Sequence, residues 1–204
     1  MKITAQLITV FTTILFTLPT FAMDWIAVGG IRYHTADPLT CVSPLICTPN
    51  SNLGYELGGL TKFPILDWLN FQTGALLVNR IVEISYNQSG STGTAGYNFW
   101  HLDVPLQAQI KILDWLFVEG GIDLGLKISS NCYATGALAC SGSNNDNSFI
   151  FPLRFGASAI YDKKWSLRFY YEMSTPLTTT PGTFGVPSKE YKSSAMGLIG
   201  GISF

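Results

Sequence analysis

Two histidines, His34 and His101, are the side chains in this sequence best suited to proton transfer near neutral pH. His101 precedes Asp103 by two positions, so both side chains lie on one face of the chain if it is extended there. A carboxylate beside an imidazole can orient it as a general base. A convincing nucleophile is missing, because Ser85 and Ser129 are arbitrary choices. We therefore predict a non-enzymatic protein with no catalytic residue, cofactor or metal.

Four cysteines are the other residues that could form a chemical site: Cys41, Cys47, Cys132 and Cys140. Their spacing lacks the close pairs of a zinc site. In an exported chain the oxidising compartment favours disulfides, and four cysteines allow three connectivities. Pairing Cys41 with Cys47 and Cys132 with Cys140 closes two small rings without requiring the two segments to meet. We favour this pairing, and pairing between the two segments is the alternative.

An apolar/polar alternation with a period of two runs through most of the chain and is clearest at residues 100–112. All even positions from Trp100 to Ile112 are apolar, whereas His101, Asp103 and Lys111 occupy odd positions. Residues 116–129 repeat the pattern. This period predicts strands that have one apolar and one polar face.

Eight segments carry the alternation: residues 25–36, 53–63, 69–86, 100–112, 116–129, 149–159, 165–173 and 194–204. The phase of the third is ambiguous beyond Val78. Long connections at 37–52, 87–97, 130–147 and 176–193 alternate with short ones at 64–68, 113–115 and 161–164. Such connections are typical of antiparallel barrels that cross a membrane. We therefore expect an all-β fold, an eight-stranded antiparallel up-and-down transmembrane β-barrel.

The apolar face of this barrel is predicted to contact lipid. Charged residues make up 12% of the chain, against ~25% in soluble domains. Four tryptophans, Trp25, Trp68, Trp115 and Trp165, precede or begin alternate segments on the side of the short connections. Tryptophan prefers the membrane–water interface, so we predict that these four form an aromatic girdle. A soluble barrel with its apolar face inside is the alternative.

The N-terminus has the organisation of a secretory signal peptide. Lys2 precedes an apolar stretch from Leu7 to Leu18, and small residues follow up to Ala22. The stretch is shorter than the ~20 residues of a membrane-spanning helix. We predict a signal peptide at residues 1–22 and one outer-membrane β-barrel domain at residues 23–204. An uncleaved anchor helix is the alternative.

The polar face then lines the lumen. Its predicted charged side chains are nearly equal in sign: Arg32, Lys62, Lys111, Lys127, Arg154 and Arg168 against Glu56, Asp103, Glu119, Asp123 and Glu172. Side chains can fill an eight-stranded barrel, and buried charges need partners. We therefore predict a salt-bridged, plugged lumen. A narrow ion-conducting channel is the leading alternative. A lipid A-modifying enzyme is less favoured, because the sequence has no His-x-Ser-Asn run.

Two motifs and the C-terminus carry a family resemblance. The motifs are Leu102–Leu106 and Trp115–Gly121, and the last segment ends on Phe204. They resemble the small eight-stranded outer-membrane barrels of the OmpA/OmpX type and the broad outer-membrane β-barrel domain family that includes PorT-like proteins. The resemblance implies a location in the outer membrane of a Gram-negative bacterium. It also implies that the barrel-assembly machinery recognises Phe204, and the family has no single activity to carry over.

The expected partners are membrane lipid, lipopolysaccharide and, during biogenesis, the barrel-assembly machinery. The formal net charge of −1 and the lack of a basic patch argue against nucleic acid. Disulfide-braced extracellular loops can contact a surface partner, because loops on rigid scaffolds carry binding. The alternative is that the loops only seal the barrel and resist proteases. We expect a structural role in the envelope, a surface-interaction role, or both.

Overall fold

The computed structural model describes residues 24–37, 45–88, 91–135, 147–180 and 189–204, so the predicted signal peptide lies outside the described residues. The strands are β1 (Asp24–Ala36), β2 (Leu45–Leu66), β3 (Leu69–Gln88), β4 (Ser91–Leu113), β5 (Leu116–Ala134), β6 (Phe149–Ile150), β7 (Leu153–Tyr161), β8 (Trp165–Thr180) and β9 (Lys189–Ser203). Among these described residues, no helix is long and apolar enough to cross a membrane.

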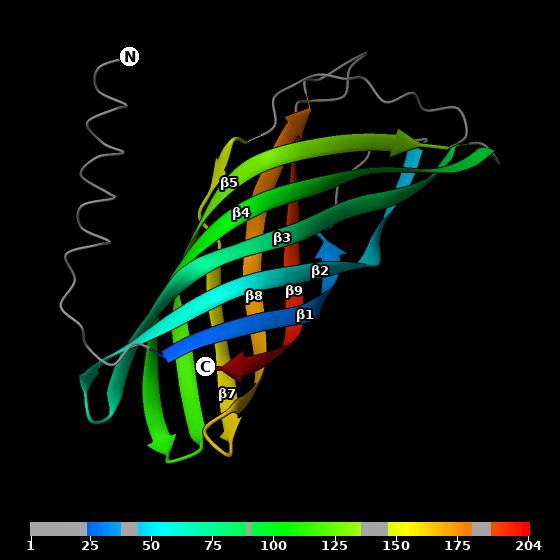
Figure 1. The fold of residues 1–204 in the computed structure, drawn as a ribbon. Helices are drawn as coiled ribbons and strands as arrows, with labels where there is room; N and C mark the ends of the chain where they lie inside the picture. Colours follow the sequence, from blue (N-terminus) through cyan, green and yellow to red (C-terminus); the bar gives the residue numbers. More distant parts are fainter. Residues whose placement is uncertain (1–23, 38–44, 89–90, 136–146, 181–188) are drawn as a thin grey trace, which may run out of the picture.

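The strands form a closed antiparallel sheet (Figure 1). β1 pairs with β2 on one side and with β9 on the other, from Ile26–Ser203 to Ala36–Ser193. β6 and β7 both pair with β5, so together they occupy one position in the wall. The ring therefore has eight strands, which confirms the predicted fold class.

Short turns connect the strands at one end of the barrel. β7 and β8 are joined by a turn at residues 162–164, in which the φ values of Asp162 and Lys163 are 52° and 54°. The Lys164 N–H donates to the Tyr161 carbonyl at 3.2 Å across this turn. Two central residues with positive φ define a type I′ turn, whose twist matches that of the flanking strands.

At the opposite end, several strands are longer than the alternation predicts. β2 begins at Leu45, β4 begins at Ser91, β5 continues to Ala134 and β8 to Thr180. The predicted long connections 37–52, 87–97, 130–147 and 176–193 are therefore partly strand, which corrects their bounds. The physical reason is that strand pairing there needs only backbone hydrogen bonds. Side chains outside the membrane need not alternate between apolar and polar.

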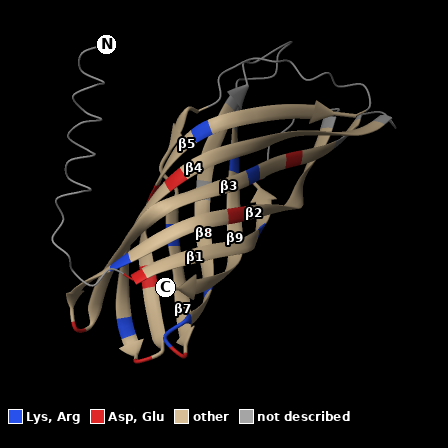
Figure 2. Ribbon diagram, in the orientation of Figure 1, with Lys and Arg blue, Asp and Glu red and all other residues tan. Residues whose placement is uncertain are grey.

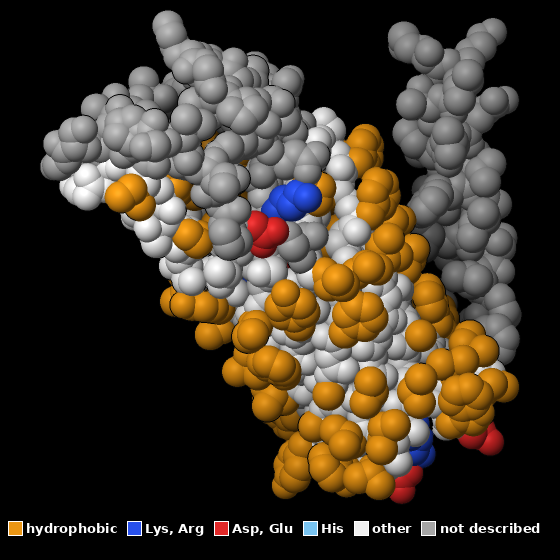
Figure 3. All heavy atoms as spheres, turned by 180° about the vertical axis from the view of Figure 1, so that it is seen from behind, with side chains coloured by type: hydrophobic (Ala, Val, Ile, Leu, Met, Phe, Trp, Pro, Cys, Tyr) orange, Lys and Arg blue, Asp and Glu red, His pale blue; other side chains and the backbone are white. Residues whose placement is uncertain are grey.

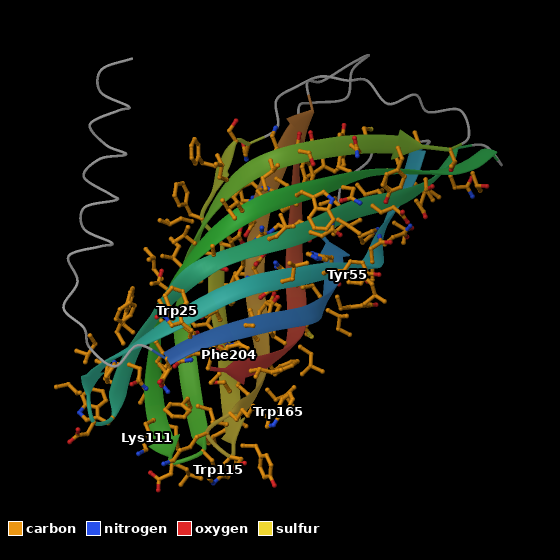
Figure 4. The ribbon with its side chains drawn as sticks, viewed as in Figure 1. Trp25, Tyr55, Lys111, Trp115, Trp165 and Phe204 are labelled. Carbon is orange, nitrogen blue, oxygen red and sulfur yellow. The ribbon has the colours of Figure 1, made fainter. Side chains whose placement is uncertain are left out.

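The outer face of the wall is apolar. Exposed side chains on it include Ile31, Leu57, Leu102, Leu124, Phe155, Phe169 and Leu198. Hydrophobic side chains cover much of the face seen in Figure 3 above the short turns. The four predicted girdle tryptophans are each about half exposed, and Figure 4 places Trp115 and Trp165 beside the short turns. The apolar face therefore lies outside, as predicted for a barrel in lipid.

The inside of the barrel is arranged in layers along β3. Leu76 and Val78 belong to an apolar cluster on the side of the short turns, and Val82 belongs to a second cluster towards the other end. Arg80 lies between them and is fully buried. Figure 2 accordingly shows charged residues at mid-length of several strands as well as at the ends. The lumen therefore contains a charged layer between two apolar clusters.

Candidate functional site

Glu172 on β8 is the centre of the charged layer. Arg32 from β1 approaches its carboxylate at 2.5 Å, and Arg80 from β3 donates through Nε and Nη2 at 3.0 Å each. Arg154 from β7 lies 3.6 Å away. None of the four side chains is more than 2% exposed. One carboxylate therefore connects three other strands across the lumen.

The same three arginines bind the other acidic side chains of the layer. Arg80 makes a bidentate pair with Asp103, with Nη1–Oδ1 at 3.1 Å and Nη2–Oδ2 at 2.7 Å. Arg154 contacts Glu56 at 3.1 Å and Asp123 at 2.7 Å. Planar guanidinium groups suit such shared contacts because they donate in several directions. Three arginines thus bind four carboxylates, which compensates the cost of burying the charges.

Tyr170 completes the layer. Its hydroxyl donates to Glu56 Oε2 at 2.6 Å, and the guanidinium carbon of Arg154 lies 4.2 Å from the ring centroid. The ring lies against Gly197 on β9, where an added Cβ would come within 2.1–2.4 Å of three Tyr170 atoms. Glycine at this position therefore makes room for the tyrosine.

A second polar group lies nearer the short turns. Arg168 Nε contacts Glu119 at 2.6 Å, and Arg168 also donates to Gln72. Gln109 Nε2 donates to Glu119 at 2.9 Å, and Ser158 donates to the same carboxylate at 3.2 Å. The adjoining cavity of about 20 Å³ has room for roughly one water molecule.

The predicted lumen residues divide into two sets. Arg32, Glu56, Asp103, Glu119, Asp123, Arg154, Arg168 and Glu172 are buried inside the barrel. The three lysines Lys62, Lys111 and Lys127 are only half-buried. Lys62 lies over the Phe117 ring at 4.3 Å, and Lys111 pairs with the turn residue Asp114 at 2.6 Å. Long lysine stems let the ammonium groups approach water, and Lys111 pairs with the turn rather than with the buried carboxylates of the predicted lumen network.

Lys111 lowers the pKa of Asp114, through their hydrogen bond and the charge of the ammonium group. Asp114 is on the turn and fully exposed to solvent, so this pair belongs to the mouth of the barrel.

Arg80 is the main residue that the sequence analysis missed. Apolar residues on both faces of β3, such as Leu77 and Val78, obscure the alternation where the phase is ambiguous. The structure continues the inward phase of Gln72 through Val78 to Arg80. Counting in steps of two from Gln72 would have found it.

The two histidines do not form a general-base site with Asp103. His34 Nε2 lies 3.0 Å from the Asn79 carbonyl oxygen, and its Nδ1 lies 3.3 Å from Ser193 Oγ. Both carboxylate oxygens of Asp103 bind Arg80, and the buried His101 packs near Phe99. In the described part of the chain, no group of three or more His, Cys, Asp or Glu residues could hold a metal ion.

The cysteines are placed in part. Cys47 lies on β2 and Cys132 on β5, which corrects the prediction that both lie in loops. Cys41 and Cys140 lie outside the described residues. β3 and β4 separate Cys47 from Cys132 in the sheet. Three strand spacings amount to ~14 Å. This exceeds the ~7 Å between Cα atoms that a disulfide can span, so these two cysteines are not direct partners.

Peptide mapping of the non-reduced protein tests the predicted disulfides. Trypsin should release Tyr33–Lys62, which contains Cys41 and Cys47, and Ile128–Arg154, which contains Cys132 and Cys140. We expect two separate peptides, each lighter by two hydrogens than its reduced form. A single species in which the two peptides are joined would instead show pairing between the segments.

Polar side chains lie on the outer face where β2, β3 and β5 extend away from the short turns. Asn50 Nδ2 donates to Glu83 at 2.7 Å and to Ser85 at 2.8 Å, and the Tyr133 hydroxyl donates to Glu83 at 2.7 Å. Burial and the neighbouring Glu83 raise the pKa of Tyr133 above its ordinary value. The hydrogen-bonded set shows that this part of the wall faces water rather than lipid.

The C-terminal residue lies at the short-turn end. The Phe204 N–H donates to the Trp25 carbonyl at 2.9 Å, and its side chain is 83% exposed (Figure 4). This geometry joins the last residue to the first strand. Its recognition by the assembly machinery stays a prediction.

Comparison with known proteins finds distant structural similarities. No curated protein sequence matches the chain. Neisserial surface protein A is 13% identical, with 88% of this chain and 97% of that chain covered and a TM-score of 0.49. Ail, the attachment invasion locus protein of Yersinia pestis, is 10% identical, with coverages of 89% and 98% and a TM-score of 0.47. OprG from Pseudomonas aeruginosa is 10% identical, with coverages of 90% and 96% and a TM-score of 0.45.

A family model also matches almost the whole barrel. It is the model of the outer membrane protein beta-barrel domain, and it matches residues 27–204. The match covers all the described strands apart from the first residues of β1. This chain therefore belongs to the outer membrane protein beta-barrel domain family and is located in the outer membrane of Gram-negative bacteria.

Proposed function

We propose that the protein is a non-enzymatic outer-membrane barrel whose lumen is closed to ions by the charged layer. The observation that carries this proposal is the contact of Arg32, Arg80 and Arg154 with Glu172, which joins four strands across the lumen. Its role is then structural in the envelope, or depends on the surface outside the membrane, rather than on transport through the lumen.

The distribution of charge supports a closed lumen. A pore selective for one ion type typically carries a ring of one sign, whereas this layer contains both signs in direct contact. Apolar clusters that include Val78 and Val82 lie on either side of the layer. An ion would have to cross both clusters and break the ion pairs between them.

The hydrogen bonds of Asp103, the predicted partner of His101, support a non-enzymatic role. Asp103 is bound to Arg80 and so is not available to orient His101. If the barrel modified lipid A, mass spectrometry of lipid A from cells that express the protein would show a new species. We expect no such change.

Planar-bilayer conductance of the refolded mature protein tests the closed lumen. We expect no discrete current steps from the wild type. The double variant Arg80→Ala/Glu172→Ala removes one positive and one negative charge together with two large side chains. Because it opens space at mid-height, we expect it to give discrete steps.

The matched control for that experiment is Lys111→Ala/Asp114→Ala, which also removes one charge of each sign but at the exposed mouth. This variant should be as silent as the wild type. Heat-modifiable migration on a gel checks that each barrel is folded. Steps in the wild type would assign the protein as a narrow channel, and a silent, folded Arg80/Glu172 variant would show that another layer closes the lumen.

The surface role is the second part of the proposal. Cys47 and Cys132 lie on strand extensions beyond the apolar belt, where the predicted disulfides would brace the adjoining loops. Exchange of residues 38–44 and 136–146 for short linkers should abolish adhesion if these loops bind a surface partner. Unchanged adhesion would leave a structural role alone.

A further inference from the structure

The wall of the barrel is incomplete between β7 and β8. The two strands pair from Tyr161–Trp165 up to Arg154–Glu172. Beyond that pair, β6 pairs with β5 and the rest of β8 with β9, so in this described stretch no ladder joins residues 149–153 to residues 173–176. Pro152 and Pro176 lie on opposite sides of this gap. Pro176, whose carbonyl accepts from Asn147 at the gap, lacks the backbone N–H that such a ladder uses, whereas the Pro152 carbonyl faces β5.

Four carbonyl groups beside the gap nevertheless accept hydrogen bonds within the protein. Those of Pro152, Met173, Pro176 and Leu177 accept hydrogen bonds at 2.9–3.0 Å from Asp123 N, Thr175 Oγ1, Asn147 Nδ2 and Asn147 N, respectively. Lipid offers no donors to a strand edge, so an open ladder normally cannot persist there. Local satisfaction of these carbonyls allows the gap to remain open.

A groove of about 300 Å³ lies over the gap on the outer face. Its outward side chains are Phe149, Phe151, Leu153, Met173 and Pro176, with Asn147 at the end away from the short turns. Ile150, at the inner side of the groove, belongs with Leu177 to the apolar cluster inside the lumen. Apart from Asn147 and the buried Thr175, the lining of the groove is therefore apolar from the outer wall to the interior.

The position of the groove indicates what occupies it. Met173 follows Trp165 by eight residues on β8, which places it roughly 20 Å above the tryptophan girdle for a strand tilted as in outer-membrane barrels. The apolar belt of such barrels is ~25 Å tall, so the groove opens in its outer half. It is continuous with the apolar wall that already contacts lipid. We propose that this groove binds one acyl chain of an outer-leaflet lipid, which lies between β7 and β8 and contacts Ile150.

Photolabelling by a lipid probe tests this site. The refolded barrel is placed in dimyristoylphosphatidylcholine vesicles that contain a phosphatidylcholine with a diazirine on its acyl chain. Mass spectrometry then locates the labelled residues. We expect residues 149–153 and 173–176 to be labelled several-fold more than the region of Met196 on β9. Met196 pairs next to this level, with Tyr171, and is 52% exposed against 44% for Met173.

Two matched variants separate a bound chain from ordinary lipid contact. Met173→Trp fills the groove and should reduce labelling of residues 149–153 several-fold, whereas Met196→Trp should leave it unchanged. Equal labelling of the groove and the Met196 region in the wild type would overturn the proposal. Labelling that persists in a folded Met173→Trp barrel would also overturn it. If free lauric acid alone abolished the labelling, the groove would be assigned to a free fatty acid, which would overturn the proposal as well.

A change in the wall itself gives an independent test. Pro176→Thr restores one backbone donor at the gap and should extend the β7–β8 ladder. We expect slower amide hydrogen exchange at residues 173–176 together with reduced labelling. Slower exchange with undiminished labelling would show that the gap does not hold the chain and would overturn the proposal.

Discussion

Replacement of Glu172 by glutamine is expected to lower the free energy of unfolding by about 3–5 kcal/mol, the cost of leaving buried charges without their partner. Glu172 makes the closest contact of Arg32, at 2.5 Å, and without its charge Arg32 keeps only the 3.5 Å contact with Glu56. Glutamine has nearly the same shape, so the loss reports charge rather than packing. Urea titration of the protein refolded in phospholipid vesicles, followed by tryptophan fluorescence, measures the change.

Asp114→Asn is the control for this experiment. It also converts a carboxylate to an amide, but at a fully exposed turn where the ion pair with Lys111 is screened by water. Its unfolding midpoint should equal that of the wild type. If Glu172→Gln is as stable as the wild type, the arginines must be compensated by their other acidic partners, and Glu172 is not the centre of the layer.

Replacement of Leu124 by arginine should destabilise the barrel, because a cation on the lipid face costs about 2–4 kcal/mol at the midplane and less towards the interfaces. Leu124 is 37% exposed on the outer wall, between the inward residues Asp123 and Gly125. The arginine would therefore enter lipid rather than the polar lumen. The same substitution at Leu106, on the outer face of β4, should act similarly. Urea titration in vesicles gives both values.

Gln107→Leu is the comparison on the inner face. Gln107 Nε2 donates to Asp123 at 3.2 Å, and loss of one such bond costs about 1 kcal/mol. The variant should therefore be clearly more stable than Leu124→Arg. The reverse order of stabilities would mean that the polar face contacts lipid and would refute the placement of the barrel in the membrane.

Much of the fold follows from local sequence. Residues 100–112 alternate strictly, and all the even side chains from Leu102 to Ile112 lie on the outer wall. The period alone cannot tell which face is outside. The four tryptophans beside the short connections and the low fraction of charged residues identified the outer face, because both depend on whether lipid or water surrounds the barrel. Once the outer face was assigned, the alternation also placed charged residues such as Arg154 and Glu172 in the lumen.

Prediction from the sequence failed where apolar and polar residues no longer alternate. On β3 apolar residues occupy both faces, so Arg80 was not recognised as inward. Outside the lipid, strands such as the start of β2 need no apolar face, so their length was underestimated. Lys111 was assigned to the polar network of the lumen because alternation gives a face but not a depth along it.

The sequence by itself determined the fold class, the lipid-facing side and most of the charged lining, since each depends on a period of two along single strands. The tertiary structure decided which charges meet. Glu172 contacts Arg32 and Arg80, which lie 140 and 92 residues away, because β3 lies opposite β8 in the closed ring and only β9 separates β8 from β1. It also decided where the wall opens between β7 and β8. Both features depend on the register and spacing of strands around the barrel, which no local pattern records.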